Sequence, residues 1–437
     1  MQTDFTIAQL ADPEIDAANS ILRKCVHCGF CIATCPTYVL LGDELDSPRG
    51  RIYLIKNMLE SGKVPTAKTV LHIDRCLSCL SCVTTCPASV DYMHLVDRAR
   101  ARIEQVFRRP LQDRMLRGVL AMVLPSPKMF RLSLIGAWLA RPFKALMPSR
   151  LKGLIGMAPP SLPPPPSAMD RPQVFPAMGP QRKRVALMTG CAQQVLRPEI
   201  NEATVRLLTR HGCEVVVAEG AGCCGALVHH LGQEGPARSQ AQANVHAWEK
   251  AAEDGGLDAI VVNASGCGTT VKDYGWMLKD DPEWASRGEA ISGLTRDITE
   301  IMAELGLKDP EGGFAGNGAP VVTYLSACSM QHGQQIKDPP KDLLEAAGFE
   351  VREPAEGHLC CGSAGTYNML QPELSARLLQ RKIENLKKTG GQIIATGNIG
   401  CLVQIAGGDW GGERPPVVHT VELLDWATGG PKPPGVP

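Results

Sequence analysis

Two cysteine runs near the start of the chain decide how its N-terminal part can fold. The first is Cys25-Val26-His27-Cys28-Gly29-Phe30-Cys31-Ile32-Ala33-Thr34-Cys35-Pro36, and the second is Cys76-Leu77-Ser78-Cys79-Leu80-Ser81-Cys82-Val83-Thr84-Thr85-Cys86-Pro87. Each run has the Cys-x2-Cys-x2-Cys-x3-Cys-Pro spacing that holds [4Fe–4S] clusters. The proline stops the turn from continuing, because its ring fixes φ and its nitrogen carries no hydrogen. The spacing therefore predicts an electron carrier.

The two runs predict two [4Fe–4S] clusters with interleaved ligands. In two-cluster ferredoxins the fourth cysteine of each run binds the cluster of the other run. We therefore assign the first cluster to Cys25, Cys28, Cys31 and Cys86 (the cluster 1 set), and the second to Cys76, Cys79, Cys82 and Cys35 (the cluster 2 set). Each cluster then ties both runs together, so metal binding contributes folding free energy. A structural zinc site is the alternative, although zinc needs only four ligands.

Composition indicates a globular protein of several domains in a reducing compartment. The chain has 437 residues and a formal net charge of zero, so we expect no general attraction to nucleic acid. It opens with a polar stretch that lacks the apolar core of a secretory signal. Metal sites therefore explain its 17 cysteines better than disulfides do. No apolar run is long enough to predict a membrane-spanning helix.

A basic amphipathic segment follows the predicted cluster domain, which we place at residues 1–110. Between Arg114 and Met169 there are eight lysines or arginines and no acidic residue, and prolines divide the segment into short helices. A segment of this kind, here residues 111–157, suits a membrane surface, with Phe130 and Trp138 entering the lipid interface. Packing against the protein's own core or a partner subunit is the alternative. Residues 158–180 contain nine prolines and predict a semi-rigid linker.

The second half of the chain is an internal repeat, at residues 181–307 and 320–427, with a glycine-rich connection between the copies. In each copy a predicted strand is followed by a first cysteine, a second strand by Cys-Cys-Gly, and a third by a last cysteine. The expected strands are 184–189, 214–218 and 258–263 in the first copy, and 320–325, 350–353 and 392–396 in the second. The first two cysteine positions are separated by 31 intervening residues in both copies.

Helical stretches between these strands predict parallel α/β units, which place ligands at the carboxyl ends of their strands. We therefore expect each copy to gather four cysteines, as a further cluster or as redox thiols: Cys191, Cys223, Cys224 and Cys267 (the repeat 1 set), and Cys328, Cys360, Cys361 and Cys401 (the repeat 2 set). Cys213 lies outside both patterns, and we expect it to be buried beside a strand. The predicted fold class is α+β and multi-domain: a helical two-cluster ferredoxin-like domain, a basic helical segment and two repeated α/β cysteine-rich domains.

The Cys…Cys-Cys-Gly…Cys pattern resembles the cysteine-rich domains of heterodisulfide reductases and of anaerobic glycerol-3-phosphate dehydrogenase subunits. Further motifs are similar to those of the iron–sulfur subunits of bacterial glycolate oxidases: the Cys25–Cys31 run, Gly42-Asp43-Glu44-Leu45, Pro48-Arg49-Gly50-Arg51, Ala264-Ser265-Gly266-Cys267-Gly268 and Leu359-Cys360-Cys361-Gly362-Ser363-Ala364-Gly365-Thr366. The chain departs from the heterodisulfide reductase pattern, because Thr270 and Gln404 stand where a second cysteine would end each repeat.

The resemblance implies an electron-transfer subunit that works with two flavoprotein-type subunits. Those subunits would carry FAD and oxidise glycolate to glyoxylate, and quinone would accept the electrons at the inner face of the cytoplasmic membrane. The chain itself shows no Gly-x-Gly-x-x-Gly fingerprint after a strand and no placeable catalytic triad, so the catalytic residues are unknown. The alternatives are the same role in a lactate or glycerol-3-phosphate dehydrogenase, or a thiol-active reductase of the heterodisulfide type.

Charged and imidazole side chains near the cysteines have two possible roles. Arg49 and Arg51 could neutralise a cluster, or they could form a solvated basic turn. A histidine near cysteines could tune a cluster or contact a quinone, although ordinary surface or core histidines are more common. The residues concerned are His27, His229, His230, His332 and His358.

Overall fold

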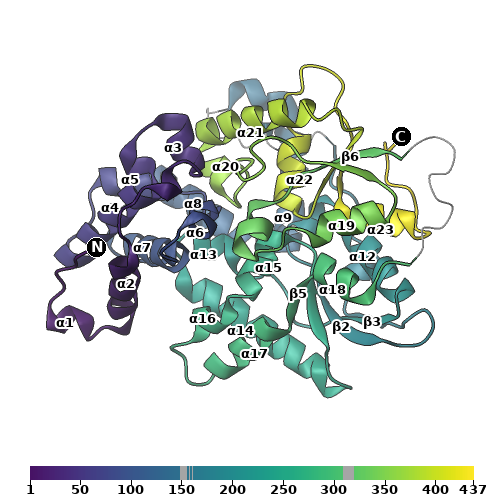
Figure 1. The fold of residues 1–437 in the computed structure, drawn as a ribbon, viewed down its shortest axis with the longest axis horizontal. Coiled ribbons are helices and arrows are strands. Elements are labelled where there is room, and N and C mark those ends of the chain that lie inside the picture. Colours follow the sequence, from purple (N-terminus) through teal and green to yellow (C-terminus); the bar gives the residue numbers. More distant parts are fainter. Residues whose placement is uncertain (148–154, 157, 160, 309–318) are drawn as a thin grey trace.

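The computed structural model describes residues 1–147, 155–156, 158–159, 161–308 and 319–437. A helical N-terminal part lies beside two α/β layers that the repeats form (Figure 1). The glycine-rich connection between the repeats falls almost wholly outside the described residues. Among the described residues, no helix is long and apolar enough to cross a membrane.

The N-terminal part is built from short capped helices around the cysteine runs. Asp12, Ser47, Thr66 and Asp91 each cap a helix by accepting a hydrogen bond from a backbone N–H of its first turn. Leu22, Ile55, Ile73 and Leu95 fill the core between four of these helices. The elements are α1 (Ile7–Leu10), α2 (Pro13–Lys24), η1 (Phe30–Ile32), α3 (Pro36–Leu41), η2 (Glu44–Asp46), α4 (Pro48–Ser61), α5 (Ala67–Asp74), α6 (Ser81–Thr85) and α7 (Tyr92–Val106).

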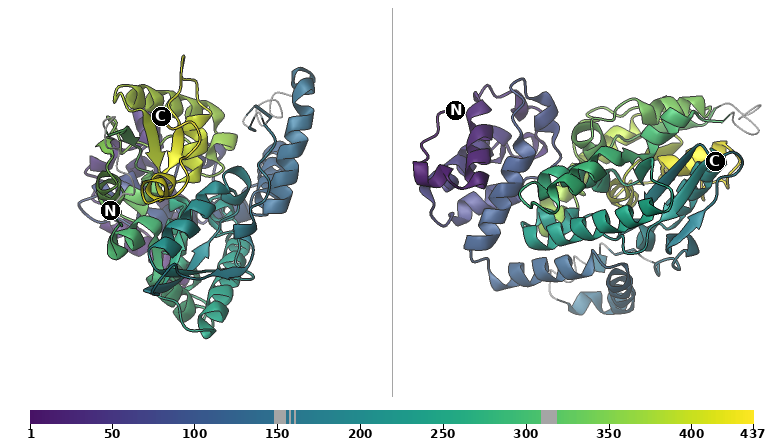
Figure 2. Two further views of the ribbon diagram at one scale, coloured as in Figure 1. Left: turned by 90° about the vertical axis from the view of Figure 1, so that its right-hand side faces the viewer. Right: turned by 90° about the horizontal axis from the view of Figure 1, so that it is seen from below.

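The basic segment forms helices at one edge of the molecule, as Figure 2 shows for the blue part of the chain. They are α8 (Leu111–Val123), α9 (Pro127–Ala140) and the 3-10 helix η3 (Arg141–Leu146). Residues 148–154 and 157 of this segment lie outside the described residues. Arg131 donates to the carbonyl of Gln194, so α9 contacts the first repeat. The expectation of short helices is confirmed for the described part.

Each repeat forms a parallel sheet with the same strand order. The first sheet is ordered β1-β3-β2-β4-β5 and the second β7-β6-β8-β9. The edge strand β1 is the exception, because it pairs antiparallel with β3. The strands are β1 (Gln173–Phe175), β2 (Lys183–Met188), β3 (Cys213–Val217), β4 (Ala259–Val262), β5 (Thr295–Asp297), β6 (Val321–Tyr324), β7 (Glu350–Arg352), β8 (Ile393–Thr396) and β9 (Val417–His419). Six of these were expected from the sequence, whereas β1, β5 and β9 were not.

Helices of the two repeats cover the sheets and fill the space between them. In the first repeat they are α11 (Gln193–Leu196), α12 (Glu199–Arg210), α13 (Ala226–His230), α14 (Glu234–Glu253), α15 (Ser265–Val271), α16 (Tyr274–Leu278), α17 (Ala285–Leu294) and α18 (Ile298–Leu305). In the second they are η5 (Ser329–Gly333), α19 (Pro339–Ala346), α20 (Tyr367–Leu370), α21 (Pro372–Lys387), α22 (Ile399–Ala406) and α23 (Thr420–Ala427). The predicted linker adds η4 (Ala168–Asp170), which packs on α12.

The two repeats share one hydrophobic core. Val185, Leu208 and Ile301 of the first repeat belong to the same buried cluster as Leu344 and Leu424 of the second. Helix α12 packs on α23, and α18 packs on α19. Helix α12 of the first repeat corresponds to α19 of the second, and α18 corresponds to α23, because each pair follows equivalent strands. The two contacts are therefore related by exchange of the repeats, as expected for a pseudo-two-fold axis. The repeats therefore pack against each other like the halves of a dimer.

Candidate metal centres

The cysteines of the two runs line two neighbouring cavities. The first cavity is lined by all four residues of the cluster 1 set, and the second by all four residues of the cluster 2 set. Cys82 lines both cavities, together with Pro48 and Tyr92. The fold thus brings Cys86 to the first run and Cys35 to the second, which is the interleaved arrangement that the ferredoxin spacing predicts. The four sulfurs at each cavity are the donor set that a [4Fe–4S] cluster requires.

The backbone takes the same unusual conformation in both runs. His27 and Gly29 of the first run have φ values of +56° and +89°. The equivalent Ser78 and Leu80 of the second run have φ values of +51° and +59°. Left-handed residues that alternate with right-handed ones turn successive N–H groups toward one side, which makes a concavity for an anion. Non-glycine residues at positive φ cost free energy, so their occurrence at matching positions indicates a functional constraint.

Burial disfavours free thiolates in the two cavities, so the cavities suit thiolates whose charge a metal neutralises. Burial raises the pKa of Cys31 to about 11 and raises the pKa of Cys82 well above its usual value. Beside the second cavity, the buried Arg51 donates to Cys35 Sγ at 3.7 Å and pairs with Asp46 at 3.3 Å. Arg49 is more exposed and pairs with Glu44 at 2.6 Å. Arg49 at the first cavity and Arg51 at the second are therefore both placed to offset the charge of a cluster, and Arg51 is the more buried of the two.

The repeat cysteines also come together in two sets of four. Cys191, Cys223 and Cys267 follow β2, β3 and β4, which are adjacent in the first sheet. Hydrogen bonds between neighbouring thiols link each set, and they lower the pKa of Cys223 in the first repeat and of Cys361 in the second. In the second repeat Cys328 Sγ lies 3.7 Å from Cys360 Sγ. Cys213 lies apart from both sets and is buried in β3, as expected.

The glycine of each Cys-Cys-Gly motif is required by the backbone. Gly225 and Gly362 have φ values of +92° and +89°. A Cβ at Gly225 would lie 3.1 Å from the carbonyl oxygen of Ala237 in α14, and one at Gly362 would lie 2.7 Å from that of Ser375 in α21. The two glycines therefore let a long helix pass directly over the cysteines.

Two residues replace the cysteines that end each repeat in heterodisulfide reductases. Thr270 donates a hydrogen bond to the carbonyl of Gly266 within its own helix. Gln404 donates to Ser375 Oγ at 2.9 Å, and Ser375 Oγ donates to the carbonyl of Gly362 at 2.8 Å. Gln404 thus stabilises the Cys-Cys-Gly loop through Ser375. Neither Thr270 nor Gln404 offers a sulfur ligand, so each cysteine set has four thiols.

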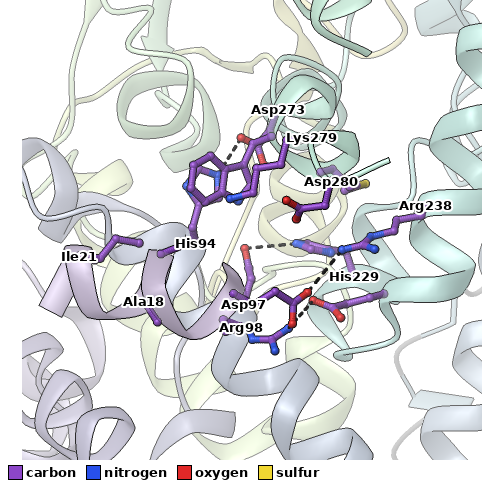
Figure 3. A pocket seen from close by; sticks show the side chains of 15 residues that line it. Ala18, Ile21, His94, Asp97, Arg98, His229, Arg238, Asp273, Lys279 and Asp280 are labelled. Atoms are coloured by element: carbon purple, nitrogen blue, oxygen red, sulfur yellow. Dashed lines mark hydrogen bonds and ion pairs between the residues drawn. The ribbon is translucent and has the colours of Figure 1, made fainter. Parts of the chain in front are cut away.

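A polar pocket lies between the helical N-terminal part and the first repeat. Figure 3 shows side chains from α2 and α7 facing those from α14 and α16 across it. His94 joins the two parts, because it contacts Asp273 Oδ1 at 2.9 Å and Asp91 Oδ2 at 2.5 Å. Its ring stacks on Trp276 with centroids 4.0 Å apart. Ion pairs therefore hold the N-terminal part and the first repeat together at this pocket, and no residue of the four cysteine sets lines it.

Three of the five histidines near the cysteines, His229, His230 and His332, have structural partners. His229 Nε2 lies 3.4 Å from Asp97 Oδ2, and His230 Nδ1 lies 3.9 Å from Asp97 Oδ1. His332 Nδ1 lies 2.7 Å from Thr84 Oγ1 of α6, and burial lowers the pKa of His332 to about 4, so it is neutral at pH 7. Burial also lowers the pKa of His27 and of His358. Sequence reasoning missed Asp97 and Thr84, because only the tertiary fold brings them to these histidines.

The arrangement fits iron–sulfur clusters. Such clusters supply one-electron transfer at potentials set by their surroundings. The cluster 1 and cluster 2 sets offer four thiols each in cavities with positive-φ backbone, and all 17 cysteines are free of disulfides. The chain's own contribution is to bury the sulfurs and to fix their spacing.

Comparisons with known proteins agree with this geometry. A 4Fe-4S dicluster domain model matches residues 24–90, and a cysteine-rich domain model matches residues 185–272 and again 322–406. These domains indicate iron–sulfur clusters and confirm the predicted fold class. A solved structure of a hypothetical protein from Helicobacter pylori is similar with a TM-score of 0.52 and 10% identity, covering 96% of this chain and 73% of that chain, which is a likeness of fold alone.

Curated relatives cover almost the whole chain. The glycolate oxidase iron-sulfur subunit of Escherichia coli is 40% identical over 98% of this chain and 99% of its own length. A probable glycolate oxidase iron-sulfur subunit of Bacillus subtilis is 34% identical over 88% of both chains. Lactate utilization protein A of Shouchella clausii is 26% identical over 55% of this chain and 98% of its own length. With its two ferredoxin-type cysteine runs and two cysteine-rich repeats, this chain belongs to the family of glycolate oxidase iron–sulfur subunits, which are subunits of an oxidoreductase complex.

Proposed function

We propose that this chain carries electrons from flavoprotein subunits, which oxidise glycolate to glyoxylate, to a quinone at the cytoplasmic face of the membrane. The observation that carries this proposal is the pair of four-thiol cavities that share Cys82 as a common wall. Two one-electron carriers side by side suit an electron pair that a flavin releases singly. The whole complex, reconstituted with and without this chain, tests the proposal: glycolate-dependent reduction of a short-chain quinone should require the chain. Equal quinone reduction without it would refute the proposal.

We infer the ligands as the cluster 1 set and the cluster 2 set. A Cys35→Ser variant should then lose the cluster held by the second run, and a Cys86→Ser variant the cluster held by the first. EPR spectra of the reduced proteins, with iron and sulfide analyses, check this, because each variant should lose about four irons. Cys213→Ser is the control and should retain all of its iron. If Cys35→Ser and Cys28→Ser lost the same EPR signal, the interleaved assignment would be wrong.

The proposed membrane attachment rests on an apolar stripe along α8 and α9. Leu111, Met115, Val119 and Met122 are each at least half exposed and recur at helical spacing on one face of α8. Leu132 and Leu139, on one face of α9, are 63% and 59% exposed. Figure 2 places these helices at an edge of the molecule, where a flat surface can reach them.

The basic residues contribute less to this surface than their number suggests. Arg117 is buried and pairs with Asp74 at 3.1 Å, and Arg141 donates to the carbonyl of Pro159 at 3.2 Å. Arg114 and Lys128 remain exposed. We therefore expect apolar insertion to dominate, with anionic lipid as a weaker attraction.

Vesicle flotation of the purified protein tests the attachment. Binding to phosphatidylcholine vesicles that contain one-third phosphatidylglycerol should fall at least tenfold in a Met115→Asp, Leu132→Asp double variant. Val64→Asp is the matched control, because Val64 is 62% exposed but lies outside the stripe. Unchanged flotation of the double variant would show that α8 and α9 face a partner protein instead.

A second candidate function is the same relay in a lactate-oxidising complex. It is favoured by the similarity of half of this chain to lactate utilization proteins. The substrate is selected on the flavoprotein side, so the test compares glycolate with lactate as electron donor for the whole complex. Glycolate should be preferred, because the relatives that cover nearly the whole chain are glycolate oxidase subunits.

A further inference from the structure

The two repeats meet the helical N-terminal part in different ways. The first repeat meets it through the polar pocket, with His94–Asp273 and His229–Asp97 contacts. The second repeat meets it through an apolar cluster in which Cys79 and Leu77 pack with Cys360, Tyr367 and Leu378. Cys328 is partly buried against this same cluster. The thiols of the second repeat therefore lie directly against the cluster 2 set.

One apolar cluster joins the cluster 2 set to the repeat 2 set, because it contains Cys79 and Cys360 and has Cys328 packed against it. Cys224 and Cys267 of the repeat 1 set belong to a different cluster, which is built mainly from residues of the first repeat. The link between His332 and Thr84 closes the seam beside Cys79 and holds η5 against α6.

A second difference lies in the helix that covers each Cys-Cys-Gly motif. Ala237 in α14 and Ser375 in α21 hold equivalent places, because each is the residue that a Cβ on the motif's glycine would meet. Seven residues further along, α14 carries Asn244 and α21 carries Lys382. Both side chains are buried, at 0% and 2% exposure. The same position is therefore neutral in the first repeat and cationic in the second.

The two side chains hold their loops in different ways. Asn244 donates to the carbonyl of Cys223 at 2.9 Å and accepts from the N–H of Gly222 at 2.7 Å. Lys382 donates to the carbonyl of Glu356 at 2.8 Å, and it lies one helical turn after Leu378, which packs with Cys360. The carboxylate of Glu356 is hydrogen-bonded by Arg381 and Asn385 instead. A buried ammonium is costly unless an anion that it can neutralise lies nearby. A metal–thiolate group of net negative charge would be that anion.

We propose that the repeat 2 set, and not the repeat 1 set, holds the redox centre that is coupled to the cluster 2 set, and that Lys382 is its built-in counter-cation. This inference rests on the proposed electron-transfer function and names the repeat through which it runs. Exchange of one electron between the two sites needs no bond change and no co-reactant, because one site is oxidised as the other is reduced. Lys382 is a positioning residue, since it stabilises the more negative, reduced state of the site without binding the metal.

The experiment uses anaerobically purified full-length protein with four single variants. Lys382→Met removes the charge and keeps most of the side-chain volume, and Lys388→Met, on the exposed end of the same helix, is its control. In an EPR-monitored redox titration, Lys382→Met should lower the reduced-to-oxidised ratio of one signal at least tenfold at fixed potential, which is 59 mV for one electron. Lys388→Met should leave that ratio unchanged. Cys328→Ser should remove this signal and sharpen the signal of the cluster 2 set, because its magnetic neighbour is lost.

The first repeat provides the decisive contrast. Cys267→Ser, at the position equivalent to Cys401, should leave the cluster 2 signal as it is in the unmodified protein. An equal effect of Cys267→Ser and Cys328→Ser on that signal, or no effect of Lys382→Met on any signal, would overturn the inference. The proposed function would survive both results as long as the two ferredoxin-run clusters are present. Absence of all iron–sulfur EPR signals from the unmodified protein would instead refute the proposed function itself.

Discussion

Replacing the glycine of the second Cys-Cys-Gly motif tests how closely α21 approaches the cysteines. Gly362 has a φ of +89°, and an added Cβ would lie 2.7 Å from the carbonyl oxygen of Ser375. A left-handed conformation costs a non-glycine residue about 1–2 kcal/mol, and overpacking of a tight contact adds about 1–3 kcal/mol. The loop cannot easily move away, because Ser375 Oγ donates to the carbonyl of Gly362 and accepts from Gln404. We therefore expect Gly362→Ala to destabilise the fold by about 2–5 kcal/mol.

Substitutions of two further glycines should destabilise the fold less than Gly362→Ala does. Gly225 has a similar φ of +92° but a milder contact of 3.1 Å, so Gly225→Ala should cost less than Gly362→Ala. Gly42 has a φ of +67° and nothing within 4 Å, so Gly42→Ala carries only the backbone cost. That cost is partly offset by about 0.4–1 kcal/mol, because alanine lowers the entropy of the unfolded chain. The order of destabilisation is therefore Gly362, Gly225, Gly42.

Anaerobic thermal unfolding of the three variants measures this order. At about 2–4 °C per kcal/mol, Gly362→Ala should lower the melting temperature by about 4–20 °C and Gly42→Ala by about 0–6 °C. Iron content before heating serves as the control that each variant carries its clusters. Equal melting temperatures for Gly362→Ala and Gly42→Ala would refute the close approach of α21 to the motif.

Two other perturbations test the helical N-terminal part. Arg51→Met should destabilise it by about 3–5 kcal/mol in urea unfolding, because it leaves the buried Asp46 without one of its partners. Arg49→Met, at a partly exposed pair, should change stability by less than about 1 kcal/mol. Equal losses would contradict the burial of Arg51. His94 joins this part to the first repeat, and although burial lowers its pKa, Asp273 and Asp91 raise it to about 9. Because the pKa of His94 is higher in the folded state than in the unfolded state, the charged ring stabilises the fold fully below pH 6.5. This stabilisation is lost as the pH rises through about 9. Melting temperatures of the unmodified protein and of His94→Gln should therefore differ at pH 6 and converge toward pH 10, and a constant difference would count against a charged His94.

The sequence by itself determined the chemistry of this protein. Spacing alone predicted the cluster sets, because three cysteines within seven residues can reach one cluster only as a local turn. The six strands that precede the cysteines were also predictable, because five of them contain a short apolar run and β7 falls at the matching place of the repeat. Strands β1, β5 and β9 were not, because each has only three residues and no cysteine motif follows it to mark its place in the repeat.

Only the tertiary structure decided which sulfur sets are neighbours. Cys79 and Cys328 are far apart in the chain, and no local pattern shows that they share one apolar seam. The roles of Lys382 and Asn244 could not be predicted from the sequence either, because a lysine or an asparagine in an amphipathic helix is expected to be solvated. Their burial depends on the helix crossing over the Cys-Cys-Gly motif. Local spacing fixes which atoms can bind a metal, whereas long-range packing fixes the charges and the neighbours that surround it.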